Sequence, residues 1–215
     1  MQSLFKPVSE TSVPLVLRST RAPADHSTDQ PVGASFRAPF RALTRQQFTD
    51  QEREFAWTRR LWRVDLHHTW HPTHAHYDGH ACIERMDQFH REVRGFDCIA
   101  QHVSVAPDGT IWTGRDWNKT PASVGFGMNE GVFMIEVIGN FDQGHDRLDG
   151  AQLASVVTVV EAVQARFRLP VQALLFHHEV PQTEKTCPGT SIDKSDLLRR
   201  VKAERTGHEP FAMAG

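Results

Sequence analysis

The sequence has little cysteine, and its few thiols form no disulfide pattern. Only Cys82, Cys98 and Cys187 occur among 215 residues. A set that is both odd and sparse argues against a disulfide framework and favours a reducing compartment. Each thiol therefore needs an explanation of its own.

Long apolar runs and charge of one sign are also missing. The 24 Lys and Arg residues nearly balance the 26 Asp and Glu residues, which gives a net charge of −2. No run of like charge points to nucleic acid as a partner. No segment approaches the roughly 18–20 apolar residues that cross a bilayer, and Pro7, Glu10 and Pro14 interrupt the apolar start expected of a secretory signal. We therefore expect no nucleic acid partner, no membrane span and a chain that is cytoplasmic as synthesised.

Tyrosine occurs once, whereas histidine occurs 13 times. Seven histidines fall within residues 67–90, and His177 and His178 form a second pair. Such clusters can bind metal, although histidines on loops are also often simply solvated, and composition alone leaves both interpretations open. The apolar content of 39% and the charged content of 23% are ordinary for one globular domain.

The beginning of the chain lacks a sustained period. Residues 1–46 carry scattered prolines and polar residues, so we interpret them as a partly irregular N-terminal extension. Thr49 and Glu52 have the spacing of a capping box, which predicts a helix that ends near residue 61. We assign residues 47–204 to one main domain and residues 205–215 to a tail.

Alternating and helical patterns then follow in turn. Residues 62–69 alternate like a strand that delivers His67 at its end, and residues 70–79 form a loop. Apolar residues recur at helical spacing over 80–94, which places Cys82 in the core. A turn at residues 107–109 predicts a hairpin between the strands 99–105 and 110–114.

The second half of the chain continues this order. Residues 132–138 are apolar on both faces except at Glu136, as expected of a central strand. An apolar stripe predicts a long helix beginning near residue 151, then a strand over 171–176 delivers His177, and a last helix covers 193–204. This order predicts an α/β fold in which a central mixed β-sheet is flanked by helices on both faces.

Three residues from distant parts of the chain could form a metal site. His67 and His177 each end a predicted strand, and Cys187 is followed by Pro188 and Gly189. Two histidines and a cysteine can hold a catalytic zinc ion while leaving one position free. Surface histidines beside a buried thiol remain the alternative.

Several blocks of sequence resemble one family. The blocks are LHHT (66–69), GTIWTGRDW (109–117), MIEVIGNFD (134–142), AQL (151–153), FHHEV (176–180) and TCPG (186–189). Together they are similar to the zinc-dependent N-acetylmuramoyl-L-alanine amidases of the amidase-2 type, a group that includes peptidoglycan recognition proteins. The resemblance covers roughly residues 60–200.

The resemblance implies zinc as the cofactor and peptidoglycan or muropeptide as the partner. The family's ligand positions fall on His67, His177 and Cys187, and His68 and His178 become candidates for supporting contacts. The implied reaction is hydrolysis of the amide between N-acetylmuramic acid and L-alanine. The sequence carries no signal for an oligomeric state.

Further roles follow from the same comparison. Glu136 matches the catalytic glutamate of the muropeptide-recycling branch, and Lys185 matches a lysine that some members direct at the developing oxyanion. The loop before Cys187 is about two residues longer than is usual in the family. Where many members have a tyrosine, this chain has Gln101, followed by His102, and Asn129 lies where the family's groove is lined.

Three functions are therefore weighed. The first is a zinc amidase, the second is a peptidoglycan-binding module of the same fold without catalysis, and the third is a stabilising zinc site in a protein with an unrelated function. The three ligand candidates favour the enzyme, whereas the missing tyrosine favours the binding module. An enzyme without a signal peptide would act on recycled fragments in the cytoplasm, or reach the wall after lysis or non-classical export.

Overall fold

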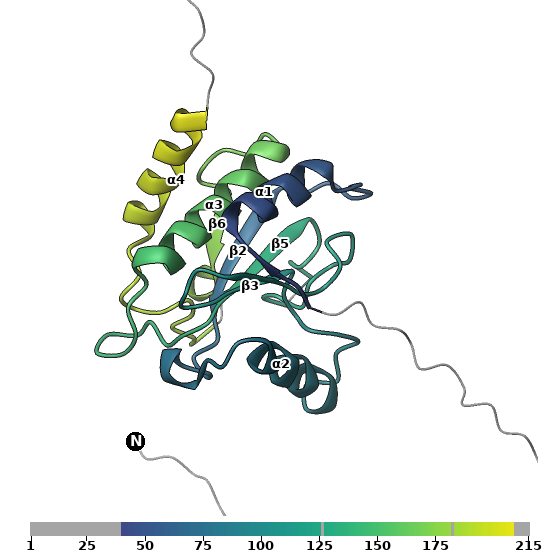
Figure 1. The fold of residues 1–215 in the computed structure, drawn as a ribbon, viewed down its shortest axis with the longest axis vertical. Helices are drawn as coiled ribbons and strands as arrows, with labels where there is room; N and C mark the ends of the chain where they lie inside the picture. Colours follow the sequence, from purple (N-terminus) through teal and green to yellow (C-terminus); the bar gives the residue numbers. More distant parts are fainter. Residues whose placement is uncertain (1–39, 126, 182, 209–215) are drawn as a thin grey trace, which may run out of the picture. The chain divides into compact units, whose positions relative to one another are not determined.

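The computed structural model describes residues 40–125, 127–181 and 183–208. They contain a six-stranded sheet in the order β1-β4-β3-β5-β2-β6 (Figure 1). The strands are β1 (Ala42–Leu43), β2 (Arg63–His68), β3 (Val103–Val105), β4 (Ile111–Thr113), β5 (Val132–Val137) and β6 (Leu174–Phe176). Neighbours among β3, β5, β2 and β6 are parallel, whereas β4 pairs antiparallel with β3 and β1. The predicted mixed sheet, with its hairpin and central β5, is confirmed.

Helices cover both faces of this sheet, also as predicted. They are α1 (Arg45–Glu54), α2 (His80–Glu92), α3 (Gly150–Arg166) and α4 (Lys194–His208), with short 3-10 turns at His74–His76 and His177–Glu179. Figure 1 shows α1, α3 and α4 on one side of the sheet and α2 on the other. No helix of the described residues has the length and apolar character to span a membrane.

The first helix differs from the prediction at both ends. Its capping box is formed by Thr44 and Gln47, and the helix ends at Glu54, where Phe55 turns the backbone to an extended conformation. The predicted box failed because Thr49 donates to the Arg45 carbonyl within the helix and Glu52 is buried in it. The expected domain boundary at residue 47 therefore falls inside α1.

The fold extends beyond the expected domain limits at both ends of the described chain. Residues 40–46 form β1 and the start of α1, so they belong to the fold rather than to an extension. The remainder of the expected extension, residues 1–39, lies outside the described residues, as do residues 209–215 of the tail. Residues 205–208 continue α4.

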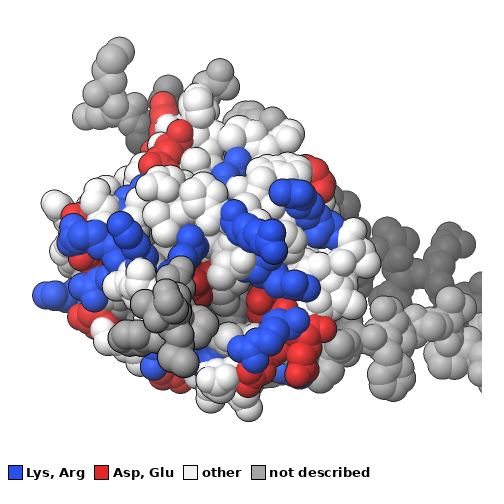
Figure 2. All heavy atoms as spheres, turned by 90° about the horizontal axis from the view of Figure 1, so that it is seen from above, with Lys and Arg blue, Asp and Glu red and all other residues white. Residues whose placement is uncertain are grey.

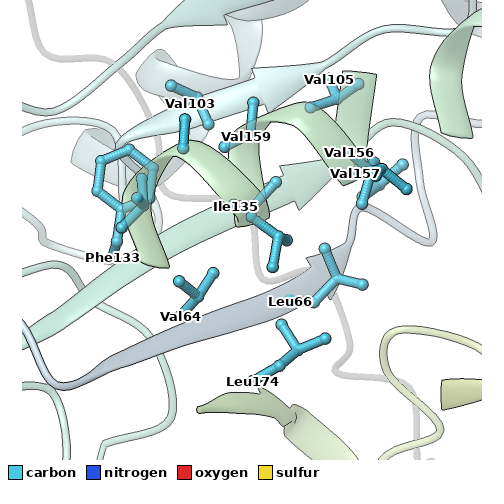
Figure 3. Packing of buried hydrophobic residues seen from close by; sticks show 14 of the residues in the cluster. Val64, Leu66, Val103, Val105, Phe133, Ile135, Val156, Val157, Val159 and Leu174 are labelled. Atoms are coloured by element: carbon cyan, nitrogen blue, oxygen red, sulfur yellow. The ribbon is translucent and has the colours of Figure 1, made fainter. Parts of the chain in front are cut away.

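The core lies between the sheet and α1, α3 and α4. Val64 and Leu66 of β2 and Ile135 of β5 point toward α3 (Figure 3), and all three are fully buried. Because side chains alternate along a strand, Asp65, His67 and Glu136 lie on the opposite face. A smaller cluster that includes Cys82, as predicted, packs α2 over part of that second face.

The surface reflects the balanced composition. Figure 2 shows lysine and arginine side chains interspersed with acidic side chains on one face of the molecule. Ion pairs also occur on α4, where Asp196 lies 2.7 Å from both Arg199 and Arg200.

Candidate metal centre

The sheet brings His67 and His177 together. Leu66 of β2 pairs with Phe176 of β6 in parallel register, so the residue that follows each of them stands at the same level. His67 is the fifth residue of β2, and His177 begins the 3-10 turn after β6. The two histidines are 110 residues apart in sequence, and the strand pairing alone makes them neighbours.

Cys187 approaches the same point on a loop that several contacts hold in place. The His178 amide donates to the Cys187 carbonyl at 2.8 Å, and the Ser191 amide donates to the Phe141 carbonyl at 2.9 Å. Gly189 has φ of +127°, and a Cβ there would lie 2.5 Å from the Phe141 backbone. Only glycine fits so close an approach, which keeps the Cys187 loop against the chain after β5.

The three side chains match the dimensions of a zinc site. The Nδ1 atoms of His67 and His177 are 3.1 Å apart, and Cys187 Sγ lies 3.5 Å from His67 Nδ1. All candidate ligand atoms lie within 4.8 Å of one another. Tetrahedral zinc, with bonds of about 2.0–2.1 Å to nitrogen and about 2.3 Å to sulfur, requires ligand atoms about 3.3–3.6 Å apart. Among the described residues this is the one group of three or more potential metal ligands.

The protonation states of the histidines suit a metal ligand. Burial lowers the pKa of His67 well below its usual value, and His177 beside it acts in the same direction. Burial, with the charge of Lys185, lowers the pKa of His177 to about 4. Both imidazoles are therefore neutral near pH 7, which is the form that binds a metal ion.

The thiol of Cys187 has the opposite tendency. Burial raises its pKa, and the nearby charge of Glu136 adds to the effect. The amide of His68 donates to Cys187 Sγ at 3.4 Å and favours the thiolate. A thiolate buried at this position needs a positive partner, which a divalent ion between the two histidines would supply.

Glu136 lies beside the three candidate ligands. It pairs with His67 across β5 and β2 and with Ser104 across β5 and β3. Burial raises the pKa of Glu136 to about 8, and the charge of Lys185 opposes this shift. A carboxyl that titrates near neutral pH is suited to accept and return a proton.

Two cavities meet at Glu136. The first, of about 600 Å³, is lined by His67, His177, Cys187, Glu136 and Lys185 together with residues of the loops around them. The second, of about 550 Å³, extends from Glu136 along α2, where Met86 and Phe89 are among its lining residues. A ligand in the first cavity therefore contacts the candidate metal ligands and Glu136 at once.

Lys185 has an exposed side chain at the edge of the first cavity. Its charge lowers the pKa values of His67, His177 and Glu136, which places its ammonium group within electrostatic reach of all three. The longer loop before Cys187 therefore still brings Lys185 to the cavity.

His68 and His178 are turned away from the three ligand atoms. His68 Nδ1 accepts from the Phe141 amide at 3.2 Å, and burial lowers the pKa of His68 to about 4. The exposed ring of His178 lies 3.4 Å from the Thr186 carbonyl. Both residues contact the Cys187 loop through their backbone amides, and His68 also lines the first cavity.

Three other predicted residues line neither cavity. The Gln101 amide donates to Ser104 Oγ at 2.8 Å, and Asn129 Oδ1 accepts from the Gly125 amide at 2.9 Å. His102 accepts from the Met134 amide and donates to the Lys119 carbonyl, both at 2.9 Å. These contacts hold the three side chains within the protein and outside the lining of the two cavities, although the buried Oε1 of Gln101 has no hydrogen-bond partner among the described residues.

Sequence reasoning missed a chain of polar groups behind His67. Ser123 Oγ lies 2.8 Å from His67 Nε2 and 2.7 Å from Asp65 Oδ2. A buried aspartate two residues before His67, on the same face of the strand, was a usable signal. Ser123 carried none, because its loop meets β2 only in the folded chain.

An α/β sheet that gathers two histidines and a cysteine at the ends of its parallel strands defines a class of candidate metal-binding proteins. A family model described as N-acetylmuramoyl-L-alanine amidase matches residues 57–190, and the chain belongs to this family. The human N-acetylmuramoyl-L-alanine amidase is 28% identical over 137 residues, covering 62% of this chain and 23% of that protein. The pig protein of the same name is 30% identical over 132 residues, covering 59% and 21%. The match thus spans less than a quarter of these curated relatives.

Solved structures show the same fold. The amidase LysC from Clostridium intestinale has a TM-score of 0.55 at 24% identity, covering 69% of this chain and 93% of that one. A Drosophila PGRP-LB variant in complex with tracheal cytotoxin has a TM-score of 0.54 at 24% identity, covering 63% and 79%. Amidases and peptidoglycan recognition proteins are therefore both structural neighbours.

Proposed function

We propose that this chain is a zinc-dependent amidase that hydrolyses the bond between N-acetylmuramic acid and L-alanine in peptidoglycan or muropeptides. The observation that carries the proposal is the convergence of His67, His177 and Cys187 beside Glu136 in one cavity. Membership of the amidase family supports the substrate class.

His67, His177 and Cys187 would hold the zinc ion. Zinc supplies a water molecule that is acidic enough to react near neutral pH and a Lewis acid that polarises the amide carbonyl. The two neutral imidazoles and the thiolate are donors that zinc prefers, and three ligands leave a position open.

Glu136 would move the proton that amide hydrolysis requires. Its carboxylate accepts a proton from the attacking water as the new carbon–oxygen bond forms. The same carboxyl then returns the proton to the nitrogen of L-alanine as the carbon–nitrogen bond breaks. The products are a free lactyl carboxylate on the sugar and a free amine on the peptide.

Lys185 would stabilise the negative charge that develops on the carbonyl oxygen. Its ammonium group is at the edge of the cavity and already influences Glu136 and His67. A charge placed toward the developing oxyanion lowers the barrier because it interacts more strongly with the transition state than with the substrate.

A second candidate is a binding module without catalysis. Gln101 in place of the family's usual tyrosine favours it, and a peptidoglycan recognition protein bound to tracheal cytotoxin is among the structural neighbours. The presence of all three ligands and of Glu136 favours the enzyme.

Mass spectrometry of a muropeptide digest separates the two candidates. The purified protein is loaded with one equivalent of zinc and incubated with the muropeptide, with and without a chelator. Release of a peptide that begins with L-alanine, only when zinc is present, supports the amidase. Binding of the muropeptide without cleavage by the zinc-loaded protein would instead establish the binding module.

A further inference from the structure

The two ring nitrogens of His67 have different surroundings. Nδ1 faces His177 Nδ1 at 3.1 Å and Cys187 Sγ at 3.5 Å, whereas Nε2 lies 2.8 Å from Ser123 Oγ. A neutral imidazole carries one proton, on one nitrogen only. The nitrogen that keeps this proton decides whether Nδ1 has a lone pair available for a metal ion.

The direction of the hydrogen bonds follows from Asp65. Asp65 Oδ1 lies 2.5 Å from Arg63 Nε, and Oδ2 lies 3.1 Å from Arg63 Nη2. Arg63 donates from two nitrogens to the two oxygens, the arrangement of an ionised carboxylate, which has no proton to donate. The Ser123 hydroxyl, 2.7 Å from Oδ2, must therefore donate its single proton to Asp65.

Ser123 has no second proton for His67. Its oxygen can only accept from Nε2, which must then carry the ring proton and leave the Nδ1 lone pair free. His177 differs, because no partner of its Nε2 is observed among the described residues. His67 is thus the ligand whose tautomer and ring orientation are set by the surrounding protein.

We propose that Asp65 and Ser123 are positioning residues that hold His67 in its Nε2-protonated tautomer and thereby present Nδ1 to the zinc ion. This inference rests on the metal site of the proposed function. Carboxylates commonly orient a metal-bound histidine directly. Here a serine on a separate loop lies between the two groups, so the loop around Ser123 takes part in metal binding without contributing a ligand.

Zinc affinity of the Ser123→Ala variant tests the proposal. We expect a loss of about 10–100-fold, which is typical when the partner of a metal-bound histidine is removed. Competition with a chromophoric chelator measures this constant on the metal-free protein. Ser123→Thr keeps the hydroxyl group and should restore most of the affinity.

Ser155→Ala is a matched control. Ser155 Oγ also donates to an acceptor within the protein, the Gly109 carbonyl, at 2.6 Å, but it belongs to α3 on the other side of the sheet. We expect its zinc affinity to stay within about two-fold of the unchanged protein. Thermal unfolding of all three variants shows whether each one is folded.

A second measurement does not depend on activity or on metal. Nitrogen-15 NMR of the histidine rings reports the tautomer of His67 in the zinc-free protein. We expect the Nε2-protonated form in the unchanged protein and a mixture in Ser123→Ala. An Nδ1-protonated His67 in the unchanged protein, or unchanged zinc affinity in a folded Ser123→Ala, would overturn the proposal.

The two proposals fail in different ways. If Ser123→Ala weakens zinc binding but the zinc-loaded protein cleaves no muropeptide, the positioning role stands and the amidase function fails. If the chain binds no zinc, the metal-dependent function fails, and the tautomer of His67 still tests the hydrogen-bond chain.

Discussion

The two faces of β2 and β5 place consecutive residues in different surroundings, one in the apolar core and the other beside a cavity. On the face beneath α3, Leu66 and Ile135 are fully buried in an apolar cluster. On the other face, their neighbours His67 and Glu136 border a cavity. Because the period of a strand is two residues, one pair of strands supports both the core and the candidate site. The two faces differ because α2 packs over only part of the second face, which leaves room for the cavity.

Buried polar groups also differ between the two sides of the sheet. On the site side, Asp65 is fully buried and accepts hydrogen bonds from Arg63 and Ser123. On the core side, Glu52 of α1 is 4% exposed, and its Oε1 has no hydrogen-bond partner among the described residues. The hydrogen bonds of Asp65 offset the cost of burying its carboxylate, whereas the unsatisfied oxygen of Glu52 lowers the free energy of unfolding.

The largest expected effect comes from a substitution that disrupts the candidate metal site and leaves the core intact. Cys187→Ala should abolish stoichiometric zinc binding and reduce amidase activity by at least about 1,000-fold, because the site loses its anionic ligand. Elemental analysis and the muropeptide digest measure the two losses. Cys98→Ala is the control, since Cys98 lies outside the ligand group. Full zinc content in Cys187→Ala would contradict the assignment.

The next effect separates chemistry from metal binding. Glu136→Gln should retain one equivalent of zinc and lose about 100–10,000-fold in kcat, the range expected for removal of a general base. Glu184, which lines the same cavity from the 183–186 loop, offers a matched control in Glu184→Gln. Full activity of Glu136→Gln would remove Glu136 from the mechanism.

A substitution on the core face should lower stability and leave zinc binding almost unchanged. Ile135→Ala, one residue from Glu136, should lower the free energy of unfolding by about 2–5 kcal/mol, because it leaves a cavity in a packed core. Urea denaturation of the metal-free protein measures this loss. Zinc affinity of the folded variant should stay within a few-fold of the unchanged protein, and a loss as large as that of Cys187→Ala would show that the two faces are not independent.

The smallest expected effect depends on pH. Burial raises the pKa of Glu52 from 4.5 to about 7, while Arg166 opposes the shift. The folded state therefore resists ionisation of Glu52, and stability is lost as pH rises from about 4.5 to about 7. Glu52→Gln should raise the free energy of unfolding by about 1–3 kcal/mol at pH 8 and by little at pH 4. Urea denaturation at both pH values checks this, and an equal gain at both would exclude ionisation as the cause.

Patterns within the strands predicted much of this arrangement. Alternation along residues 62–69 and the apolar run at 132–138 identified β2 and β5, and the ends of the predicted strands delivered His67 and His177. The chemistry of zinc ligands suggested Cys187 as their partner, and the family resemblance favoured the same three residues. Which strands lie side by side is a long-range property, so the register that sets His67 beside Glu136 required the structure.

The error in the first helix has a local physical cause. Two capping boxes, Thr44 with Gln47 and Thr49 with Glu52, lie five residues apart, and burial of Glu52 selects the first. The roles of Gln101 and His102, by contrast, came from their place in the family pattern and stay predictions. In the folded chain the Gln101 amide donates to Ser104, and His102 contacts the Met134 amide and the Lys119 carbonyl.

The register of β2, β5 and β3 has a consequence for the durability of the site. His67, Glu136 and Ser104 occupy one row across three parallel strands. Adjacent strands are separated by about 4.8 Å through backbone hydrogen bonds, whatever side chains they carry. The backbone hydrogen bonds therefore set the lateral separation between Glu136, the proposed proton-transferring group, and His67, a candidate metal ligand. Substitutions that repack the core can therefore accumulate during evolution without changing the spacing between His67 and Glu136.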